Sequence, residues 1–260
     1  MIPKIIHYTW FSNDEMPEKI KQCLASWKQT LRGYEFRKWD MDAIKDIDSI
    51  FLKEALQAHK WAYAADFVRL FAIYHCGGIY LDTDVILLKP LDEFLSEPCF
   101  IGKESSIHYE NEGVMQGLSS HCFGAEKNNP FIADCLAYYK DRHFITSDEK
   151  DLPQPLRMNI VLLPYIQGLI AHQRGYDWRP SVQRVQKIKD YATIYPSRIF
   201  DPFQGKSVNH AHSCCIHLAA GGWRDKEGSK KMRIGLLEKF FMIIVRKMLA
   251  PLHYEVRKFN

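Results

Sequence analysis

The stretch from residue 75 to residue 91, HCGGIYLDTDVILLKPL, decides both the expected fold and the expected site. Its two glycines end a helical pattern that covers most of residues 49–76, and Ile79 begins a short apolar strand. Asp82 and Asp84 close that strand with one residue between them, and the chain then becomes apolar again. Two like charges at the end of a buried strand are costly unless something compensates them, so they direct attention to function.

Outward from this stretch, the spacing of apolar residues predicts alternating strands and helices. We expect strands at 4–11 and 34–40, and an amphipathic helix at 16–31 whose apolar residues recur at spacings of three and four. This order predicts an α/β fold with a mainly parallel central sheet, flanked by helices and joined by right-handed crossovers. Ligands of such sheets bind outside the carboxyl ends of the strands, where the two aspartates are expected.

The composition is that of an ordinary globular protein. The chain has 260 residues, of which 47% are hydrophobic and 25% charged, and its net charge is +4. That charge suits an anionic ligand but is too small to indicate a nucleic-acid partner. Seven cysteines without a Cys-x-x-Cys indicate reduced, buried thiols. With no signal-peptide pattern and no long apolar run, we expect a cytoplasmic protein, soluble or peripheral to a membrane.

The paired aspartates predict a divalent-cation site if the chain bends after the strand. Residues two apart in a strand point to opposite faces, but a bend lets both carboxylates converge on one cation. Hard oxygen ligands with no nearby cysteine favour Mg²⁺ or Mn²⁺ over zinc, and Mg²⁺ completes its shell with water and phosphate oxygens. A solvated turn would carry the same two residues, so the pattern alone leaves both interpretations open.

Asp66 and Arg69 are the only charged residues, histidine aside, between Trp61 and Leu81. Because they are three apart on a helix, they share one face. They are either a surface ion pair, which would stabilise the fold little, or they project into the same cleft as the aspartates. In the cleft, Arg69 would contact phosphate and Asp66 would accept hydrogen bonds from hydroxyl groups.

Several segments, in their order along the chain, resemble the DXD-motif glycosyltransferases of family 32. This family includes initiating α-mannosyltransferases and many capsular and lipopolysaccharide transferases, and it is distantly similar to the catalytic domains of clostridial glucosylating toxins. The segments are IPKIIHYTWF at 2–11, ADFVRLFAIYHCGGIYLDTDV at 65–85, CFGAEKNNPFI at 122–132, IYPSRIFDPF at 194–203 and CIHLAAGGW at 215–223. Their agreement covers most of the chain, whereas a lone Asp-x-Asp would not be specific.

The resemblance implies a GT-A type fold, a nucleotide-sugar donor, a divalent metal that is usually Mn²⁺, and transfer with retention of configuration. By position, Trp10 would stack on the nucleobase, and Asp66 and Arg69 would contact the donor sugar and phosphate. Asp82 would meet the ribose and the metal, and Asp84 would be the main metal ligand.

The closing block completes this implied site and departs from the family pattern. His217 would be a further metal ligand or a diphosphate contact, and Trp223 would close over the phosphate. Relatives commonly have a second histidine where this chain has Leu218, and a serine where it has Gly222. Leu218 cannot ligate a metal, so His217, His212, a backbone carbonyl or water would have to serve instead.

The expected function is therefore a metal-dependent, retaining hexosyltransferase. It would move a hexose from a UDP- or GDP-sugar to a glycan or lipid-linked acceptor, in surface polysaccharide synthesis. One alternative is a nucleotidyltransferase, which the absence of a glycine-rich phosphate loop near the first strand disfavours. Another is a catalytically weak nucleotide-sugar-binding protein, which the departures at Leu218 and Gly222 leave open.

Two domain segments follow from the pattern. Residues 1–229 are expected to form one catalytic domain, because no repeat, low-complexity segment or linker interrupts them. Residues 230–260 form a basic, amphipathic pattern that predicts a helical tail. The tail would either pack on the domain or lie on an anionic membrane face, which would suit a lipid-linked acceptor.

Two further groups are interpreted as non-catalytic. Glu104, Glu110 and Glu112 fall in a polar stretch after the third strand and are expected to be solvated. The segment HAHSCCIH at 210–217 suggests zinc, but its spacings match no structural zinc pattern.

Overall fold

The structure, a computed structural model of the chain, describes residues 1–110, 113–151, 153–202 and 211–219. All of them lie within the unit Met1–Ala220. The predicted tail at 230–260 and its boundary at 229 lie outside the described residues. No helix within the described ranges is long and apolar enough to cross a membrane.

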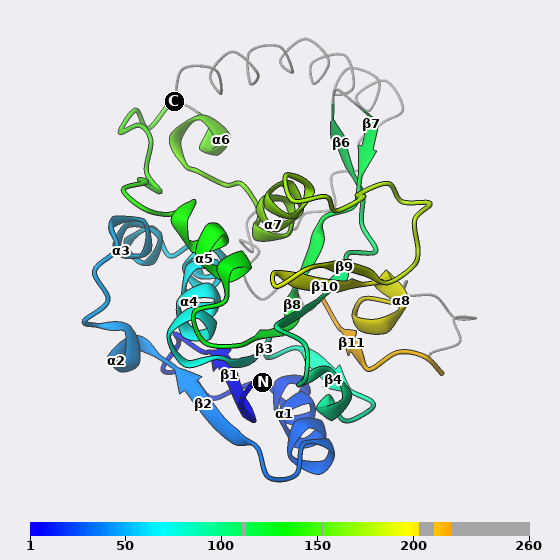
Figure 1. Cartoon of the computed structure of the whole chain (residues 1–260). Helices are drawn as coiled ribbons and strands as arrows, with labels where there is room; N and C mark the ends of the chain where they lie inside the picture. Colours follow the sequence, from blue (N-terminus) through cyan, green and yellow to red (C-terminus); the bar gives the residue numbers. More distant parts are fainter. Residues whose placement is uncertain (111–112, 152, 203–210, 220–260) are drawn as a thin grey trace, which may run out of the picture. The chain divides into compact units, whose positions relative to one another are not determined.

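A seven-stranded sheet forms the centre of the described unit (Figure 1). Pairing is antiparallel only where the fourth or the last strand of this sheet takes part, so five of the seven strands run in the same direction. The predicted α/β fold with a mainly parallel sheet is confirmed. In spatial order the strands are β2 (Glu35–Trp39), β1 (Ile5–Thr9), β3 (Gly78–Leu81), β8 (Leu118–Ala125), β5 (Cys99–Lys103), β10 (Ala192–Tyr195) and β9 (Gln186–Ile188).

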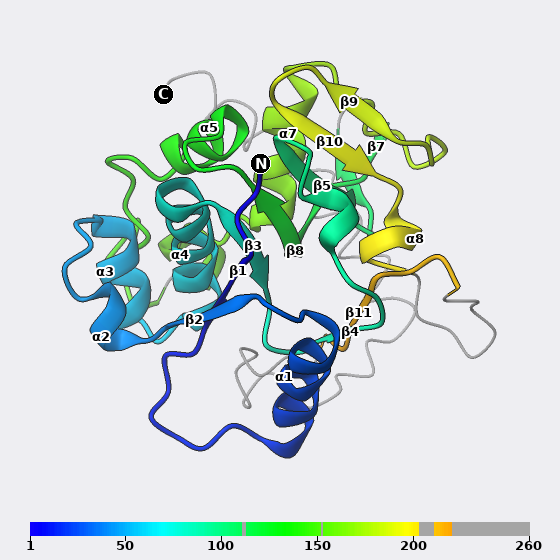
Figure 2. The ribbon, with the colours of Figure 1, turned by 60° about the horizontal axis from the view of Figure 1, so that its bottom comes forward.

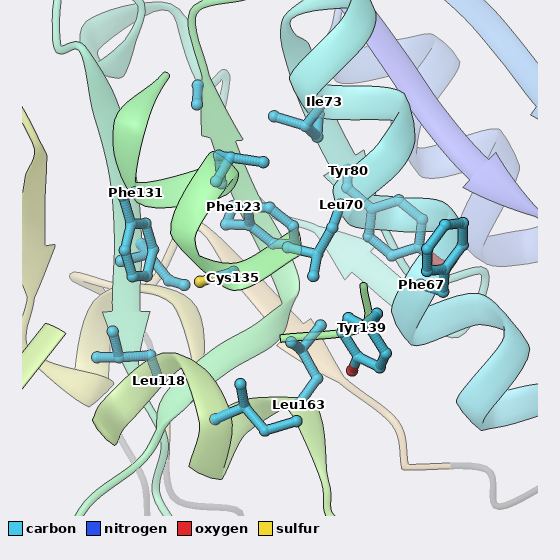
Figure 3. Close-up of a cluster of buried hydrophobic side chains, with 14 of the residues drawn as sticks. Phe67, Leu70, Ile73, Tyr80, Leu118, Phe123, Phe131, Cys135, Tyr139 and Leu163 are labelled. Atoms are coloured by element: carbon cyan, nitrogen blue, oxygen red, sulfur yellow. The ribbon is translucent and has the colours of Figure 1, made fainter. Parts of the chain in front are cut away.

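One face of the sheet carries the larger of two apolar cores. Figure 3 shows Phe67 and Leu70 packed beside Tyr80 of β3 and Phe123 of β8, with all four side chains buried. Burial of such large side chains is the main favourable contribution to folding on this face. The helices that supply this core are α3 (Ile50–Gln57), α4 (Trp61–Cys76), α5 (Pro130–Ala137) and α7 (Leu163–His172).

The opposite face carries the second core, because successive strand residues alternate between faces. Ile79 and Leu81 of β3 point to this side and join the buried ring of Trp27. The Trp27 indole N–H donates to the Val85 carbonyl at 2.8 Å, which fixes the strand that follows the aspartates. The elements on this side are α1 (Glu18–Thr30), β4 (Val85–Leu87), η1 (Asp92–Phe94) and α8 (Ser197–Phe200) (Figure 2).

The remaining elements lie outside the central sheet. β4 pairs antiparallel with β11 (Cys215–His217), which brings two segments that are far apart in sequence side by side. The hairpin of β6 (His108–Glu110) and β7 (Gly113–Met115) and the short helices α2 (Met41–Ile44) and α6 (Gln154–Arg157) complete the described elements.

The predicted helical stretch before the aspartates consists of α3 and α4. They are separated at His59, whose φ is 54°, and α4 ends at Gly77, whose N–H donates to the Ile73 carbonyl at 2.8 Å. Gly77 and Gly78 have φ values of 66° and 111°, so the expected glycine cap is confirmed. This turn connects α4 directly to β3, and both elements lead into the site.

Candidate active site

The two aspartates lie in a tight turn at the carboxyl end of β3. The Asp82 N–H donates to the His121 carbonyl at 2.9 Å, and the Asp82 carbonyl accepts from the Val85 N–H at 3.0 Å. The chain therefore bends between β3 and β4, as the prediction of converging carboxylates required. On the far side of the turn, the Asp84 carbonyl accepts from the Leu218 N–H at 3.0 Å, which ties the turn to the end of β11.

His217 reaches the aspartates through the pairing of β11 with β4. The register places His217 opposite Val85, and its Nε2 lies 3.2 Å from Asp84 Oδ1. Burial alone would lower the pKa of His217, but a hydrogen bond that the His217 ring donates to Asp84 and the charges of Asp82, Asp84 and Asp201 together raise it. The structure therefore brings together the three residues that the sequence proposed as metal ligands.

The donor atoms of these residues fit a divalent cation. One ligand atom each from Asp82, Asp84 and His217 lie within 4.8 Å of one another. Two carboxylates with one imidazole suit Mn²⁺, because carboxylates favour Mg²⁺ and Mn²⁺ while imidazole favours transition metals. Leu218 contributes only its backbone N–H to this arrangement.

Asp66 and Arg69 are buried beside the aspartates, with only 7% and 4% of their surface exposed. Arg69 Nη2 lies 3.2 Å from Asp66 Oδ1 and 3.3 Å from Asp82 Oδ1. The interpretation of Asp66 and Arg69 as a surface ion pair is therefore wrong, and α4 delivers both to the site.

Every donor group of the Arg69 guanidinium meets an acceptor from the protein. Nη1 donates to the Ser120 carbonyl at 2.7 Å and to Asp82 Oδ2 at 3.3 Å, and Nε donates to the Ala65 carbonyl at 3.2 Å. The guanidinium carbon also lies 4.5 Å from the centre of the Tyr80 ring, in a cation–π contact. Arg69 thus joins α4, β3 and β8 at one point.

The charge on Asp82 is compensated without any ligand. Besides Arg69, the Tyr80 hydroxyl donates to Asp82 Oδ1 at 3.0 Å, and Thr9 at the end of β1 lies 3.0 Å from the same hydroxyl. Burial raises the pKa of Asp66 to about 6, although Arg69 acts in the opposite direction. The backbone N–H of Leu163, at the start of α7, also donates to Asp66. The site is therefore pre-organised by α4, α7 and three neighbouring strands.

Trp10 lies at the carboxyl end of β1, half-buried beside a cavity of about 500 Å³. Its backbone N–H continues the ladder to the Trp39 carbonyl at 3.1 Å, and its indole N–H donates to the Asp14 carbonyl at 3.3 Å. Phe11, Lys38 and Asp40 are among the other residues that line this cavity. The other predicted tryptophan, Trp223, lies outside the described residues, as does Gly222.

One of the glutamates differs from its prediction. Glu104 directly follows β5 and is half-buried, with its Oε2 2.9 Å from His108 Nε2. The expectation of a solvated loop carboxylate is therefore wrong for Glu104, because the strand end and the His108 contact hold it against the domain. The Glu110 side chain and Glu112 lie outside the part of the chain that can be described.

The sequence did not identify three side chains of the site. Tyr80 contacts Arg69 and Asp82, and His121 and Asp201 lie beside His217. His121 immediately precedes the segment 122–132, and Asp201 lies within the segment 194–203. Both residues thus lie in or next to segments that resemble the family. The sequence pattern of those segments nevertheless gave neither residue a role.

Comparison with known proteins agrees with this geometry. Residues 17–101 match the family described as a glycosyltransferase sugar-binding region containing the DXD motif. Inositol phosphoceramide mannosyltransferase 3 of Schizosaccharomyces pombe is 33% identical over 135 residues, which cover 50% of this chain and 35% of that protein. Mannosyl phosphorylinositol ceramide synthase SUR1 of Saccharomyces cerevisiae is 28% identical over 145 residues, which cover 54% of this chain and 35% of that protein. The chain thus spans less than half the length of these relatives.

Among solved structures, the PaToxG glycosyltransferase overlaps with a TM-score of 0.43 and 20% identity, over 66% of this chain and 69% of that one. A glycosyltransferase involved in glycosylation of the major capsid of PBCV-1 overlaps with a TM-score of 0.38 and 14% identity, over 83% of this chain and 93% of that one. The matched segment 17–101 contains α4, β3 and the turn with both aspartates. The predicted resemblance is confirmed for this segment, which is similar to the glycosyltransferase sugar-binding region that contains the DXD motif.

Proposed function

We propose that this protein transfers a hexose from a UDP- or GDP-sugar to a glycan or lipid-linked acceptor, with the help of a divalent metal. The observation that carries the proposal is the convergence of Asp82, Asp84 and His217 within 4.8 Å, beside the buried Arg69, at the carboxyl edge of the sheet. The names of the similar proteins, which are inositol phosphoceramide mannosyltransferases, make a mannosyl donor and a lipid-linked acceptor the first candidates.

Asp82, Asp84 and His217 would hold the metal, with Mn²⁺ preferred over Mg²⁺ because of the imidazole. When bound, the cation would supply Lewis-acid stabilisation of the negative charge on the leaving diphosphate. The positive charge of Arg69 would add to that stabilisation from a fixed position, since its contacts to Asp82 and to the Ser120 carbonyl orient the guanidinium.

The donor would extend from the metal toward β1. Asp66 would accept a hydrogen bond from a hydroxyl of the donor sugar, and the ribose would lie near Asp82. The nucleobase would stack on Trp10, in the cavity of about 500 Å³ at the ends of β1 and β2. Trp223 would close over the phosphates. We further propose retention of configuration, with the acceptor hydroxyl attacking from the face that the diphosphate leaves.

A thermal-shift experiment tests the donor and the metal together. UDP-glucose, UDP-galactose, GDP-mannose and the free diphosphates would each be added with Mn²⁺, with Mg²⁺ and with EDTA. The proposed function predicts that one donor raises the melting temperature only when metal is present, because a ligand that binds the folded state stabilises it by mass action. No shift with any donor would contradict the proposal.

The reaction product then separates enzyme classes. A glycosyltransferase given the stabilising donor releases UDP or GDP, whereas a nucleotidyltransferase releases pyrophosphate. Asp84→Asn should remove both the metal-dependent shift and nucleotide release. Asp48→Asn is the matched control, because Asp48 is 96% exposed and pairs only with Lys53 in the described residues. Pyrophosphate as the product would overturn the transferase assignment.

A further inference from the structure

The imidazole of His217 stacks on a second imidazole, that of His121. The rings of His217 and His121 stack with their centroids 4.3 Å apart and their planes inclined by 22°. His121 belongs to β8, in the middle of the central sheet, and is only 5% exposed. By contrast, His217 ends the three-residue strand β11, which pairs only with the equally short β4 in the described structure. The ring that faces Asp84 thus belongs to a short strand and stacks on a buried ring of the central sheet.

Hydrogen bonds hold the His121 ring in place. Its Nε2 lies 2.9 Å from the Phe200 carbonyl, which can only accept, so Nε2 carries the proton. Its Nδ1 lies 3.1 Å from Ser119 Oγ, so this nitrogen also has a hydrogen-bond partner within the fold. Both nitrogens are thus used within the fold, and the ring offers His217 its face rather than a ligand atom.

Asp201 lies beside both stacked histidine rings. It follows Phe200 at the end of α8, and its Oδ2 accepts from the Ser105 N–H at 2.7 Å and from the Ser105 Oγ at 3.0 Å. One carboxylate oxygen of Asp201 lies within 4.8 Å of a ring nitrogen of both His121 and His217. Asp201 therefore places a negative charge, held by its contacts to Ser105, beside the His217 ring.

We propose that His121 and Asp201 are positioning residues, which hold the His217 ring in the orientation that presents Nε2 to the proposed metal. This inference rests on the proposed function and deepens it. It also identifies what supports His217 in a chain where the next residue, Leu218, has no polar side chain. Partners that orient a ligating imidazole typically contribute about 10–100-fold to metal affinity.

Binding of Mn²⁺ to the purified 260-residue chain, without donor, tests the inference. Free Mn²⁺ is measured by electron paramagnetic resonance in the unsubstituted protein and in four variants. His121→Ala removes the stacked ring, and His121→Phe keeps a ring of similar size without its two hydrogen bonds. Asp201→Asn keeps an oxygen that can accept from Ser105 but removes the charge.

The fourth variant, His172→Ala, is the matched control. His172 stacks on Trp178 with centroids 3.7 Å apart, and its Nδ1 contacts the Tyr176 carbonyl at 2.7 Å. The substitution removes a comparable ring stack in a part of the fold that contributes no proposed metal ligand. Thermal unfolding of every variant separates a change in stability from a change in metal affinity.

We expect the dissociation constant for Mn²⁺ to rise about 10–100-fold in His121→Ala, with a smaller rise in His121→Phe and in Asp201→Asn. His172→Ala should lower the melting temperature and leave the dissociation constant unchanged. Unchanged affinity in folded His121→Ala, or an equal loss in His172→Ala, would overturn the positioning role alone. Absence of Mn²⁺ binding by the unsubstituted protein would overturn the metal site itself, and the two failures are therefore distinguishable.

Discussion

Arg69 connects several parts of the candidate site. It contacts Asp66, Asp82 and the Ser120 carbonyl at the same time, from a buried position. A lysine at this position could not reproduce these contacts, because its ammonium lacks the planar fork of the guanidinium. We expect Arg69→Lys to lower the transfer rate about 10²–10³-fold.

The same substitution should also reduce stability, by about 1–3 kcal/mol, because buried acceptors lose their partners. Turnover and urea unfolding measure the two effects separately. Arg37→Lys is the control, since Arg37 pairs at the surface with Glu35 two residues away. Full transfer activity in Arg69→Lys would show that the network around Asp82 does not depend on the guanidinium.

At this scale the sequence predicted which neighbouring charged residues the structure brings together. Asp66, Arg69, Asp82 and Asp84 could be recognised because they are charged residues within an otherwise apolar stretch. His121 and Asp201 could not, because their closeness to His217 depends on how β8, α8 and β11 pack. The spacing of these residues along the chain does not predict that packing.

Among the elements, the turn from α4 into β3 is the most constrained. Gly78 has a φ of 111°, and a Cβ there would lie 2.7 Å from the Ile5 carbonyl oxygen in the neighbouring strand. We expect Gly78→Ala to cost at least about 1–3 kcal/mol of unfolding free energy, because both the strain and the backbone clash oppose the methyl group.

Gly175→Ala provides the matched comparison for this turn. Gly175 has a similar φ of 102°, but nothing lies within 4 Å of its added Cβ. Urea unfolding should therefore show a clearly larger loss for Gly78→Ala than for Gly175→Ala. Equal losses would mean that the close approach of β1 and β3 does not contribute.

His7 joins β1 to the same turn and to β2. Its Nε2–H donates to the Gly77 carbonyl at 2.8 Å, and its Nδ1 accepts from the Trp39 indole at 3.0 Å, so the ring is neutral. Burial lowers the pKa of His7 from 6.5 to about 4. The unfolded chain therefore takes up the proton first. The contribution of His7 to stability is complete above pH 6.5 and is lost as the pH falls to 4, by roughly 3 kcal/mol.

Urea unfolding of the unsubstituted protein and of His7→Gln across this pH range measures that contribution. Asp66 acts in the opposite sense, because its raised pKa of about 6 lets the folded state hold a proton that the unfolded chain has released. Only the difference between the two proteins therefore isolates His7. Two parallel stability curves would contradict the account.

The existence of the elements was easier to predict than their pairing. The helix at 18–30, the strands β1 to β3 and the glycine cap follow from local periodicity and turn residues. The reversed direction of β8 and the pairing of β4 with β11 do not, because both depend on contacts between distant segments. The fold class and the elements of the first half of the chain could therefore be predicted from the sequence. The order of the strands in the sheet could not.

For the whole molecule, the candidate site brings together segments spread over most of the described chain, from Thr9 to His217. The C-terminal segment 230–260 lies outside the described residues, and its contact with an anionic membrane stays a prediction, as does a cytoplasmic location. If the tail binds membrane, the chain 1–260 should sediment with vesicles containing phosphatidylserine, and removal of 230–260 should abolish this. Unchanged sedimentation after removal would contradict the prediction.

The central claim is that Asp82, Asp84 and His217 form a metal site at which a nucleotide sugar reacts. The most direct test is the rate of nucleoside diphosphate release from the stabilising donor, at saturating Mn²⁺, for the unsubstituted protein and for Asp84→Asn. We predict a folded variant whose rate is lower by about 10²–10³-fold or more. A folded Asp84→Asn protein that releases the diphosphate at the unsubstituted rate would contradict the claim.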